Sequence, residues 1–362
     1  MVEYGEPDVI QEVPIPELRP NCIIAKVLMA GVCGTDVHQR NGTIEFKPPL
    51  PNIQGHETLG EIVELGPGRN FDIAGQPLKP GDRIMWAHPF CGKCYYCSVH
   101  RKPYMCTDMR NGYGFAAPDH LHGGFAEYVY IDEVIEVVRV PDSVLDTEAL
   151  GVGCAFRTVV SGFERLQKIS AIGTADSVVV QGCGPIGLYS TLLASHSGAG
   201  KVIVVGAPAN RLELAREWGA THTIDIDEIK DHNERVKIVR DLTDGRGAEF
   251  CIEGAGVPEA FLQGFDFMCK DCTYLVMGQT STKTVPFMPN LLMGKQACVI
   301  GSGGADTKHF YKALKFIEAH RERIDFSKII SATYELEDIN TALDNMGKGI
   351  DIKGAIDLRD RC

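Results

Sequence analysis

The sequence predicts an α/β protein with two parts, a β-rich part and a doubly wound parallel sheet. Up to about residue 155, short β-rich segments alternate with turn residues such as Gly-Pro-Gly at 66–68. From residue 156, apolar strands alternate with helices, which is typical of a parallel sheet because its buried strands read as continuous apolar runs. At 362 residues the chain is long enough for two domains, each with its own core.

The elements follow from local patterns in chain order. In the first part, apolar and β-branched residues predict strands at 23–30, 61–66 and 125–131. In the second part we expect helices at 156–166 and 211–218, and strands at 177–181, 248–256, 273–279 and 296–304. After about residue 302 the pattern predicts a helix at 308–320, a strand and a helix within 331–346, and a closing strand near 354–358.

Composition limits the classes of function. The formal net charge of −12 argues against nucleic acid as the main partner, because phosphate binding needs a basic surface. We find neither a signal peptide nor an apolar run of about 18 residues, so we expect no membrane partner. The 13 cysteines without an export signal favour reduced thiols and metal ligation over disulfides. We therefore expect a cytoplasmic enzyme.

A glycine-rich turn indicates a nucleotide site. The stretch "GCGPIG" fits G-x-G-x-x-G, directly follows the apolar strand "SVVVQ", opens a helix and leads to a second strand. That context turns a weak pattern into the Rossmann dinucleotide-binding fingerprint, although a glycine-rich turn in another parallel-sheet protein is the alternative. The turn and the helix N-terminus would hold the cofactor diphosphate. The expected contacts are Gly182, Gly184, Pro185, Ile186 and Gly187.

The residue that closes the second strand bears on the choice of cofactor. An NAD site usually has Asp or Glu there to bind the ribose hydroxyls, whereas this chain has Gly206. The missing carboxylate removes the repulsion against an NADP phosphate, but the first following cation is Arg211. We expect NAD(P), with a preference for NAD for want of a cationic clamp.

Four cysteines in the stretch "CGKCYYCSVHRKPYMC" indicate a metal lobe. Cys91, Cys94 and Cys97 have C-x-x-C-x-x-C spacing, and Cys106 follows. Four thiolates can surround one zinc ion tetrahedrally and leave no open position, so this zinc would be structural. An iron–sulfur cluster has the same first three spacings, but its fourth cysteine comes sooner and precedes a proline. Plain thiols or a nucleic-acid finger would also fit the pattern, although the acidic charge of the chain suits a finger poorly.

A second set of metal-binding side chains is dispersed along the chain. Cys33 lies in "GVCGTDVH", His56 and Glu57 lie in "GHE", and Cys154 lies in "GVGCAF". Each is weak alone, because a single cysteine in apolar surroundings is more often a core residue. Their combination with the glycine turn and the four-cysteine lobe carries more weight.

These motifs resemble the zinc-dependent alcohol dehydrogenases of the medium-chain dehydrogenase/reductase superfamily. The resemblance spans nearly the whole chain, through "GVCGTDVH", "GHETLGEIVELG", "PGDRI", the lobe, "GGFAEYV", "GCGPIG" and "CIEGAG". It implies a GroES-like catalytic domain of residues 1–155 and 303–362, and a Rossmann domain of residues 156–302. It also implies dimers or tetramers that associate through the cofactor domain.

The resemblance implies that Cys33, His56 and Cys154 bind a catalytic zinc, which gives two zinc ions per chain. Asp36 would orient the ligating histidine. Glu57 would be a transient fourth ligand or lie behind the ligands, and a purely structural role is its alternative.

Three further roles are implied by the resemblance. Thr35 would contact the alcohol, or else cap a helix that starts near Asp36. His38 would end a proton relay, or else be a solvated surface histidine. Lys353 would lie near the cofactor diphosphate, or else be a surface lysine.

The implied reaction is reversible oxidation of a primary or secondary alcohol to an aldehyde or ketone, by hydride transfer to NAD(P). A zinc-free quinone or enone reductase of the same superfamily is one rival, but it would lack both metal sets. A non-catalytic zinc and nucleotide-binding protein is the other, and it needs no open metal position. Polyols, cyclic or terpenoid alcohols and aliphatic alcohols all remain open as substrates.

Overall fold

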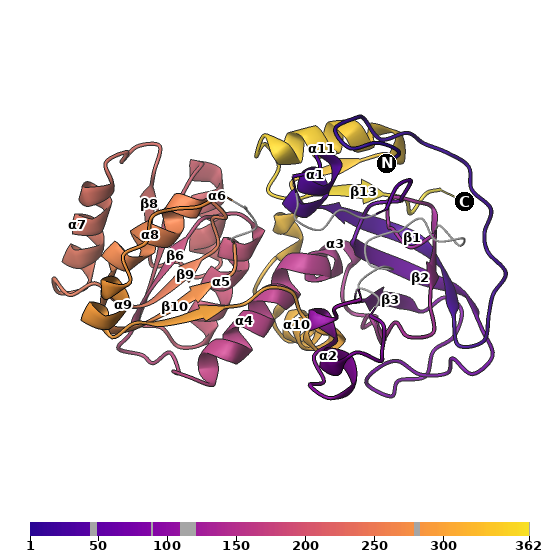
Figure 1. Cartoon of the computed structure of the whole chain (residues 1–362), viewed down its shortest axis with the longest axis horizontal. Coiled ribbons are helices and arrows are strands. Elements are labelled where there is room, and N and C mark those ends of the chain that lie inside the picture. Colours follow the sequence, from indigo (N-terminus) through magenta and orange to yellow (C-terminus); the bar gives the residue numbers. More distant parts are fainter. Residues whose placement is uncertain (44–48, 88–89, 109–120, 279–282, 362) are drawn as a thin grey trace. The chain divides into compact units, whose positions relative to one another are not determined.

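The computed structural model describes residues 1–43, 49–87, 90–108, 121–278 and 283–361. The chain forms two compact units (Figure 1): unit 1 comprises Met1–Arg157 and Gly304–Cys362, and unit 2 comprises Thr158–Gly303. None of the helices in the described ranges is long and apolar enough to cross a membrane.

Unit 1 is built on one mixed sheet. Within the described residues it has seven strands in the order β12-β13-β1-β2-β3-β5, with β4 also paired to β1. The central strand β1 runs antiparallel to both β2 and β13, so the end of β1 lies beside the start of each neighbour. The strands are β1 Ile23–Val32, β2 Glu57–Leu65, β3 Arg83–Trp86, β4 Tyr128–Ile131, β5 Val137–Arg139, β12 Ala332–Tyr334 and β13 Gly354–Asp357.

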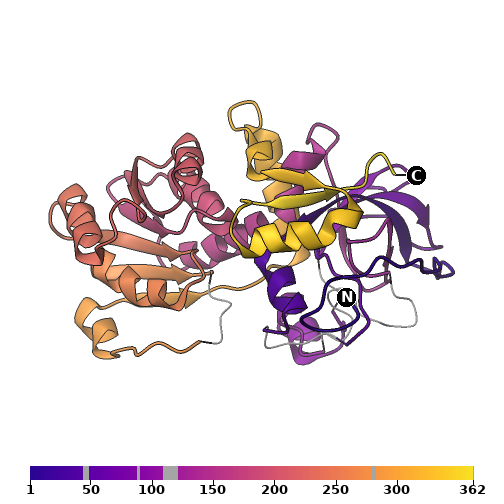
Figure 2. The same cartoon turned by 90° about the horizontal axis from the view of Figure 1, so that it is seen from above.

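Short helices connect these strands and cover the sheet. The C-terminal helix α11 packs against α1, although the two come from opposite ends of the chain (Figures 1 and 2). The α-helices of unit 1 are α1 Gly34–Arg40, α2 Tyr95–Ser98, α3 Asp146–Leu150, α10 Thr307–His320 and α11 Ile339–Gly347. The 3-10 helices are η1 Pro103–Met105, η3 Phe326–Ile329 and η4 Leu336–Asp338, and η2 Val152–Phe156 is a π-helix.

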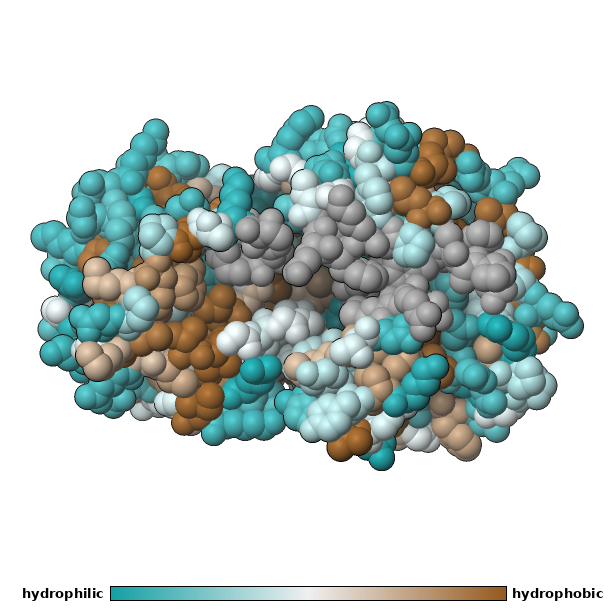
Figure 3. Space-filling view, in the orientation of Figure 1, coloured by the Kyte–Doolittle hydropathy of each residue, from teal (hydrophilic) through white to brown (hydrophobic). Residues whose placement is uncertain are grey.

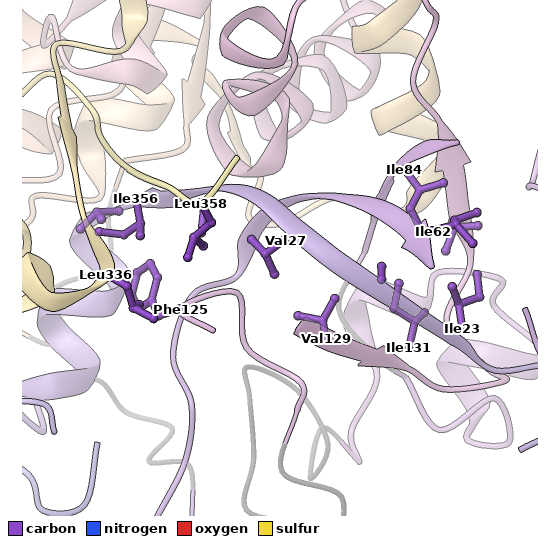
Figure 4. Close-up of a cluster of buried hydrophobic side chains, with 14 of the residues drawn as sticks. Ile23, Val27, Ile62, Ile84, Phe125, Val129, Ile131, Leu336, Ile356 and Leu358 are labelled. Carbon is purple, nitrogen blue, oxygen red and sulfur yellow. The ribbon is translucent and has the colours of Figure 1, made fainter. Parts of the chain in front are cut away.

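A hydrophobic core fills one face of this sheet (Figure 4). Along β1 the core side chains alternate as Ile23, Ala25 and Val27, and then shift to Ala30 and Val32. The shift occurs where the β1–β2 register changes between Val27 and Met29. Because neighbouring strand residues point to opposite faces, the irregularity places Gly31 on the face away from this core.

Unit 2 is a parallel sheet with helices on both faces (Figures 1 and 2). The described strands have the order β11-β10-β9-β6-β7-β8, and every pairing is parallel. This is the doubly wound strand order. From β6 the chain adds β7 and β8 on one side, and then returns to add β9, β10 and β11 on the other side, so the order reverses between β6 and β9. The strands are β6 Ser177–Gln181, β7 Lys201–Gly206, β8 His222–Asp225, β9 Ala248–Glu253, β10 Met268–Val276 and β11 Cys298–Gly301. The helices are α4 Arg157–Gln167, α5 Pro185–His196, α6 Ala209–Glu217, α7 His232–Leu242, α8 Pro258–Phe267 and α9 Asn290–Lys295.

The predicted fold class is confirmed, and the differences are local. The strand expected at 125–131 begins only at Tyr128, because the amide of Phe125 bonds to the Gln54 carbonyl outside the sheet. Strand β8 and helices α7 and α8 were not among the expected elements. Four-residue β8 has only one buried side chain, Ile224, so its apolar pattern is too short to predict a strand.

Candidate active site and metal centres

The antiparallel pairing of β1 with β2 brings the first two proposed ligands together. Cys33 directly follows β1, and His56 directly precedes β2, whose first residue pairs with Gly31 of β1. As a result the Cys33 Sγ lies 3.4 Å from the His56 Nε2, although 23 residues separate them in the chain. The strand pairing, and not any local motif, therefore creates this contact.

Asp36 fixes both of these side chains. Its Oδ2 accepts a hydrogen bond from the backbone N–H of Cys33 at 3.0 Å, and its Oδ1 lies 3.0 Å from the His56 Nδ1. The carboxylate is fully buried. A carboxylate that holds Nδ1–H leaves Nε2 as the free ring nitrogen, which is the arrangement that histidine ligands of metals use.

Cys154 completes the group from a different element. It lies in the π-helix η2, a form of helix that is frequent at functional sites. The buried Arg157 donates from Nε to the Gly153 carbonyl at 2.7 Å and from Nη1 to the Ala305 carbonyl at 3.1 Å, which holds this helix in place. One ligand atom each from Cys33, His56, Glu57 and Cys154 lies within 4.8 Å of the others.

The charges of this group suit a cation. The hydrogen bond from Cys154 and the neighbouring His56 hold the pKa of Cys33 well below its usual value, against the effect of burial. Burial would lower the pKa of His56, but Asp36 and Cys33 outweigh it and raise that pKa well above its usual value. The hydrogen bond to Cys33, with burial, raises the pKa of Cys154. Cys33 is thus predisposed to be a thiolate, the form that binds metals.

The structure also places the two candidate proton-transfer residues. Helix α1 carries Thr35 and His38 three residues apart, which puts them on one side of the helix. The capping alternative for Thr35 is wrong, because Cys33 is the N-cap and its Sγ accepts from the Thr35 N–H at 3.3 Å. His38 is half-buried, and its Nδ1 lies 3.0 Å from the Thr43 Oγ1.

Lys353 lies inside unit 1. Its Nζ donates to the Glu57 Oε2, and only 2% of its side chain is exposed, so the surface-lysine alternative is wrong. Burial lowers the pKa of Lys353, but Glu57, Cys33 and Cys154 outweigh burial and raise it, which keeps the amine charged. A contact with the cofactor diphosphate stays a prediction.

The four lobe cysteines come together as a separate cluster. Their sulfur atoms lie within 4.8 Å of one another, with Cys94 Sγ 3.4 Å from Cys97 Sγ and 3.9 Å from Cys106 Sγ. Backbone N–H groups point at the sulfurs, as from Cys94 to the Cys91 Sγ at 3.3 Å. Bonds from backbone amides lower the pKa of Cys94 to about 6. The described cysteines of the chain are all free thiols.

The glycine turn of unit 2 leaves open space for a ligand. Gly182 has φ 91°, and a Cβ there would lie 2.7 Å from the Ala255 Cα, so only glycine fits. Gly184, the N-cap of α5, has no heavy atom within 4 Å of an added Cβ. Pro185 and Ile186 begin the helix, and a Cβ on Gly187 would collide with the Gly182 carbonyl. The first turn of α5, whose backbone N–H groups have no partner within the helix, therefore begins beside open space at Gly184.

Gly206 ends β7 beside this turn. A Cβ on Gly206 would lie 2.8 Å from the Cys183 Sγ, so a carboxylate cannot be placed there without displacing that thiol. Burial raises the pKa of Cys183 to about 11, and its neutral thiol donates to the Ala207 carbonyl at 3.0 Å. Arg211 lies half-buried in the first turn of α6.

Two polar residues at the ends of strands were missed by sequence reasoning. Asp225 ends β8 directly beside Gly206 and supplies a carboxylate at that edge. Glu253 ends β9, and its carboxylate accepts from the N–H groups of Ala255, Gly256 and Gly278 at 2.8–3.1 Å. The sequence signal for Glu253 was a carboxylate at the end of an apolar run in "CIEGAG". For Asp225 there was no such signal, because the strand that it ends was not predicted.

Comparisons with known proteins agree with this geometry. Residues 19–142 match the model of the alcohol dehydrogenase GroES-like domain, and residues 185–319 match that of the zinc-binding dehydrogenase family. The 5-exo-hydroxycamphor dehydrogenase of Pseudomonas putida is 33% identical over 349 residues, which cover 96% of this chain and 94% of that protein. The sorbitol dehydrogenase of Halalkalibacterium halodurans is 29% identical over 352 residues, covering 95% and 94%.

Comparison with solved structures also gives alcohol dehydrogenases. The crystal structure of an alcohol dehydrogenase from Thermotoga maritima matches with a TM-score of 0.90 and 32% identity, covering 98% of this chain and 97% of that one. The chain therefore belongs to the zinc-dependent alcohol dehydrogenases of the medium-chain dehydrogenase/reductase superfamily. It is an oxidoreductase that acts on the CH–OH group of a small-molecule alcohol with zinc and a nicotinamide cofactor.

The double hydrogen bonding of Asp36 leads to a testable prediction. In the variant Asp36→Asn, the amide no longer attracts the His56 Nδ1–H as a carboxylate does, so the free Nε2 is less basic and less well oriented. We expect metal affinity to fall about 10- to 100-fold, as measured by competition with a chromophoric chelator. Unchanged affinity would show that Asp36 does not orient the ligand; Asp344→Asn, an exposed carboxylate of the same unit, is the control.

Proposed function

We propose that Cys33, His56 and Cys154 hold the catalytic zinc of this alcohol dehydrogenase, and that Cys91, Cys94, Cys97 and Cys106 hold a second, structural zinc. The observation that carries the proposal is the group of two thiols, one imidazole and one carboxylate oxygen within 4.8 Å, outside any disulfide. The donor set fits zinc, since two cysteines and one histidine with a free fourth position are a known catalytic arrangement. The Glu57 Oε1, buried without a hydrogen-bond partner among the described residues, also fits a nearby cation.

The residues of helix α1 would handle the substrate proton. Zinc, when bound, supplies Lewis-acid chemistry that makes an alcohol hydroxyl acidic near neutral pH. The half-buried Thr35 hydroxyl would hold that proton, since its own backbone is tied to the Cys33 Sγ. His38, three residues further along α1, would be the base at the exposed end of the path.

The turn of unit 2 would hold the nicotinamide cofactor. The backbone N–H groups of Gly184, Ile186 and Gly187 would bind the diphosphate, where the N-terminus of α5 favours negative charge. We propose NAD as the preferred cofactor, because Asp225 brings a carboxylate beside Gly206, where it would repel the 2′-phosphate of NADP. Arg211, in the first turn of α6, is the cation that would instead attract the 2′-phosphate of NADP.

The chain would also form a dimer through unit 2. Strand β11 is the end strand of the described sheet, and an end strand offers unpaired backbone groups to a second copy. Hydrophobic side chains gather over the α9 and β10 side of this unit (Figure 3), and the exposed ones include Met288, Met293 and Val299. Such a patch is typical of an interaction surface.

One cysteine variant in each proposed metal site should have a different effect on activity and on melting temperature. Purified protein should contain about two zinc ions per chain. Cys33→Ala should lose one zinc ion and all alcohol oxidation while keeping its melting temperature and its affinity for NADH. Cys94→Ala should lose the other zinc ion and unfold at lower temperature, because a structural zinc contributes folding energy.

Metal content by mass spectrometry and thermal unfolding check this pair of variants. Activity is followed at about 340 nm, the band of the reduced cofactor. The alcohol panel contains a bicyclic secondary alcohol, a polyol and an aliphatic alcohol, as suggested by the relatives. Full activity of Cys33→Ala would refute the catalytic site, and an unshifted melting temperature of Cys94→Ala would refute the structural one.

Position 206 is a glycine and carries no carboxylate, so the cofactor preference would depend on Asp225 instead. Asp225→Asn should shift the ratio of NADPH to NADH affinity toward NADPH by about three- to tenfold, because a half-exposed charge is partly screened by solvent. Cofactor fluorescence titrations measure both affinities. Asp227→Asn in the same turn is the control. An unchanged ratio for Asp225→Asn would refute its role.

A charge on β11 tests the dimer. The protein should elute at twice its chain mass of 39.6 kDa in light-scattering chromatography. Val299→Lys should elute as a monomer, because a lysine at a paired strand edge cannot be buried against a second copy. Val63→Lys, at an exposed strand position of unit 1, should remain a dimer. A monomeric wild type, or a dimeric Val299→Lys, would contradict the proposal.

A further inference from the structure

A buried ion pair joins two strands that are not neighbours in the sheet of unit 1. Glu57 is the first residue of β2, Lys353 directly precedes β13, and β1 lies between these two strands. The Lys353 Nζ nevertheless reaches the Glu57 Oε2 across β1, joining residues 296 positions apart in the chain. Only 2% and 1% of the two side chains are exposed. The Lys353 carbonyl accepts from the Ser331 N–H at 2.9 Å, which fixes the base of the lysine.

Two glycines make room for this pair. A Cβ on Gly31, in the intervening strand, would lie 2.5 Å from the Glu57 Oε2. A Cβ on Gly153, in the π-helix that carries Cys154, would lie 2.8 Å from the Glu57 Cβ. The backbone on both sides therefore leaves a passage that the glutamate and the lysine fill.

The two oxygens of Glu57 have different surroundings. Oε2 is bound by Lys353, whereas Oε1 is buried without a hydrogen-bond partner among the described residues. Oε1 lies 4.0 Å from the His56 Nε2, and one oxygen of the carboxylate belongs to the group with Cys33 and Cys154. The carboxylate is thus shared between a permanent cation on one side and the proposed metal position on the other.

This division decides how many protein ligands a zinc ion meets. Carboxylates are good zinc ligands, and a catalytic zinc needs one coordination position free of protein. A buried carboxylate that loses its cation is left unpaired, which is strongly unfavourable. With the lysine removed, ligation of the metal is the nearest way for Glu57 to recover a charged partner.

We propose that Lys353 is a positioning residue that holds Glu57 back from the zinc ion and so keeps the fourth coordination position open to the substrate. The proposal rests on the ligand assignment made under the proposed function. It gives Lys353 a role toward the metal that is separate from any contact with the cofactor diphosphate.

The test replaces zinc by cobalt(II) and titrates the open position with azide, followed by visible absorption. In the wild type, azide should change the cobalt spectrum, and the closed four-cysteine site should not respond. Lys353→Met should bind azide at least about tenfold more weakly, equivalent to about 1.4 kcal/mol, because Glu57 occupies the position. The double variant K353M/E57Q should bind azide as E57Q does, since the neutral amide is a poor ligand and needs no counter-ion.

Lys353→Arg is the matched control, because it keeps the cation, and it should retain most of the azide response. Should Lys353→Met fail to fold, Lys353→Gln carries the same test, since its amide can still donate to Glu57 but has no charge. NADH affinity is measured for every variant; a loss of NADH affinity with unchanged azide binding would assign Lys353 to the cofactor instead.

The outcomes distinguish the ligand assignment from the role of Lys353. If the wild-type cobalt spectrum does not respond to azide, the ligand assignment itself fails. If the wild type responds and Lys353→Met binds azide with the same affinity, the ligand assignment stands and the role of Lys353 is refuted. Weak azide binding in K353M/E57Q, compared with E57Q, would also refute it.

Discussion

The site in unit 1 depends on the antiparallel pairing of β1 with both of its neighbours. That pairing puts the end of β1 beside the starts of β2 and β13, and so gathers Cys33, His56, Glu57 and Lys353 from distant parts of the chain. A register slip of one residue would turn these side chains to the opposite face. The apolar core on the other face of β1, and the irregularity after Val27, prevent such a slip because they fix which residues are buried.

Three charged side chains are buried where β1 ends beside the starts of β2 and β13. Asp36, Glu57 and Lys353 are all almost fully buried, and each has a specific partner: His56 and the Cys33 backbone for Asp36, and the other member of the pair for Glu57 and Lys353. Buried charges seldom add net stability, so such a network is better explained by function than by folding. Its effect would be to fix the orientation of the proposed ligands before a metal ion binds, which is what preorganised sites require.

Sequence reasoning reached the fold class and the two groups of proposed ligands that the structure brings together, because the motifs that carry them follow one another along the chain in a distinctive order. It left open a capping role for Thr35 that the structure excludes, since the helix begins two residues earlier, at Gly34, with Cys33 as its cap. It did not foresee the Lys353–Glu57 pair or the Cys183–Gly206 contact. Both arise between separate strands or between a turn and a strand end, and no periodicity within one segment contains that information.

Above all, we propose that three protein ligands, and not four, hold the metal of unit 1. Anomalous diffraction at the zinc absorption edge from crystals of the purified enzyme tests this most directly. We expect one peak among Cys33, His56 and Cys154, with the Glu57 carboxylate still on Lys353, and a second peak inside the four-cysteine lobe. A structure with no peak at the first position, or with Glu57 as a ligand of that zinc ion while Lys353 is unpaired, would contradict the proposal.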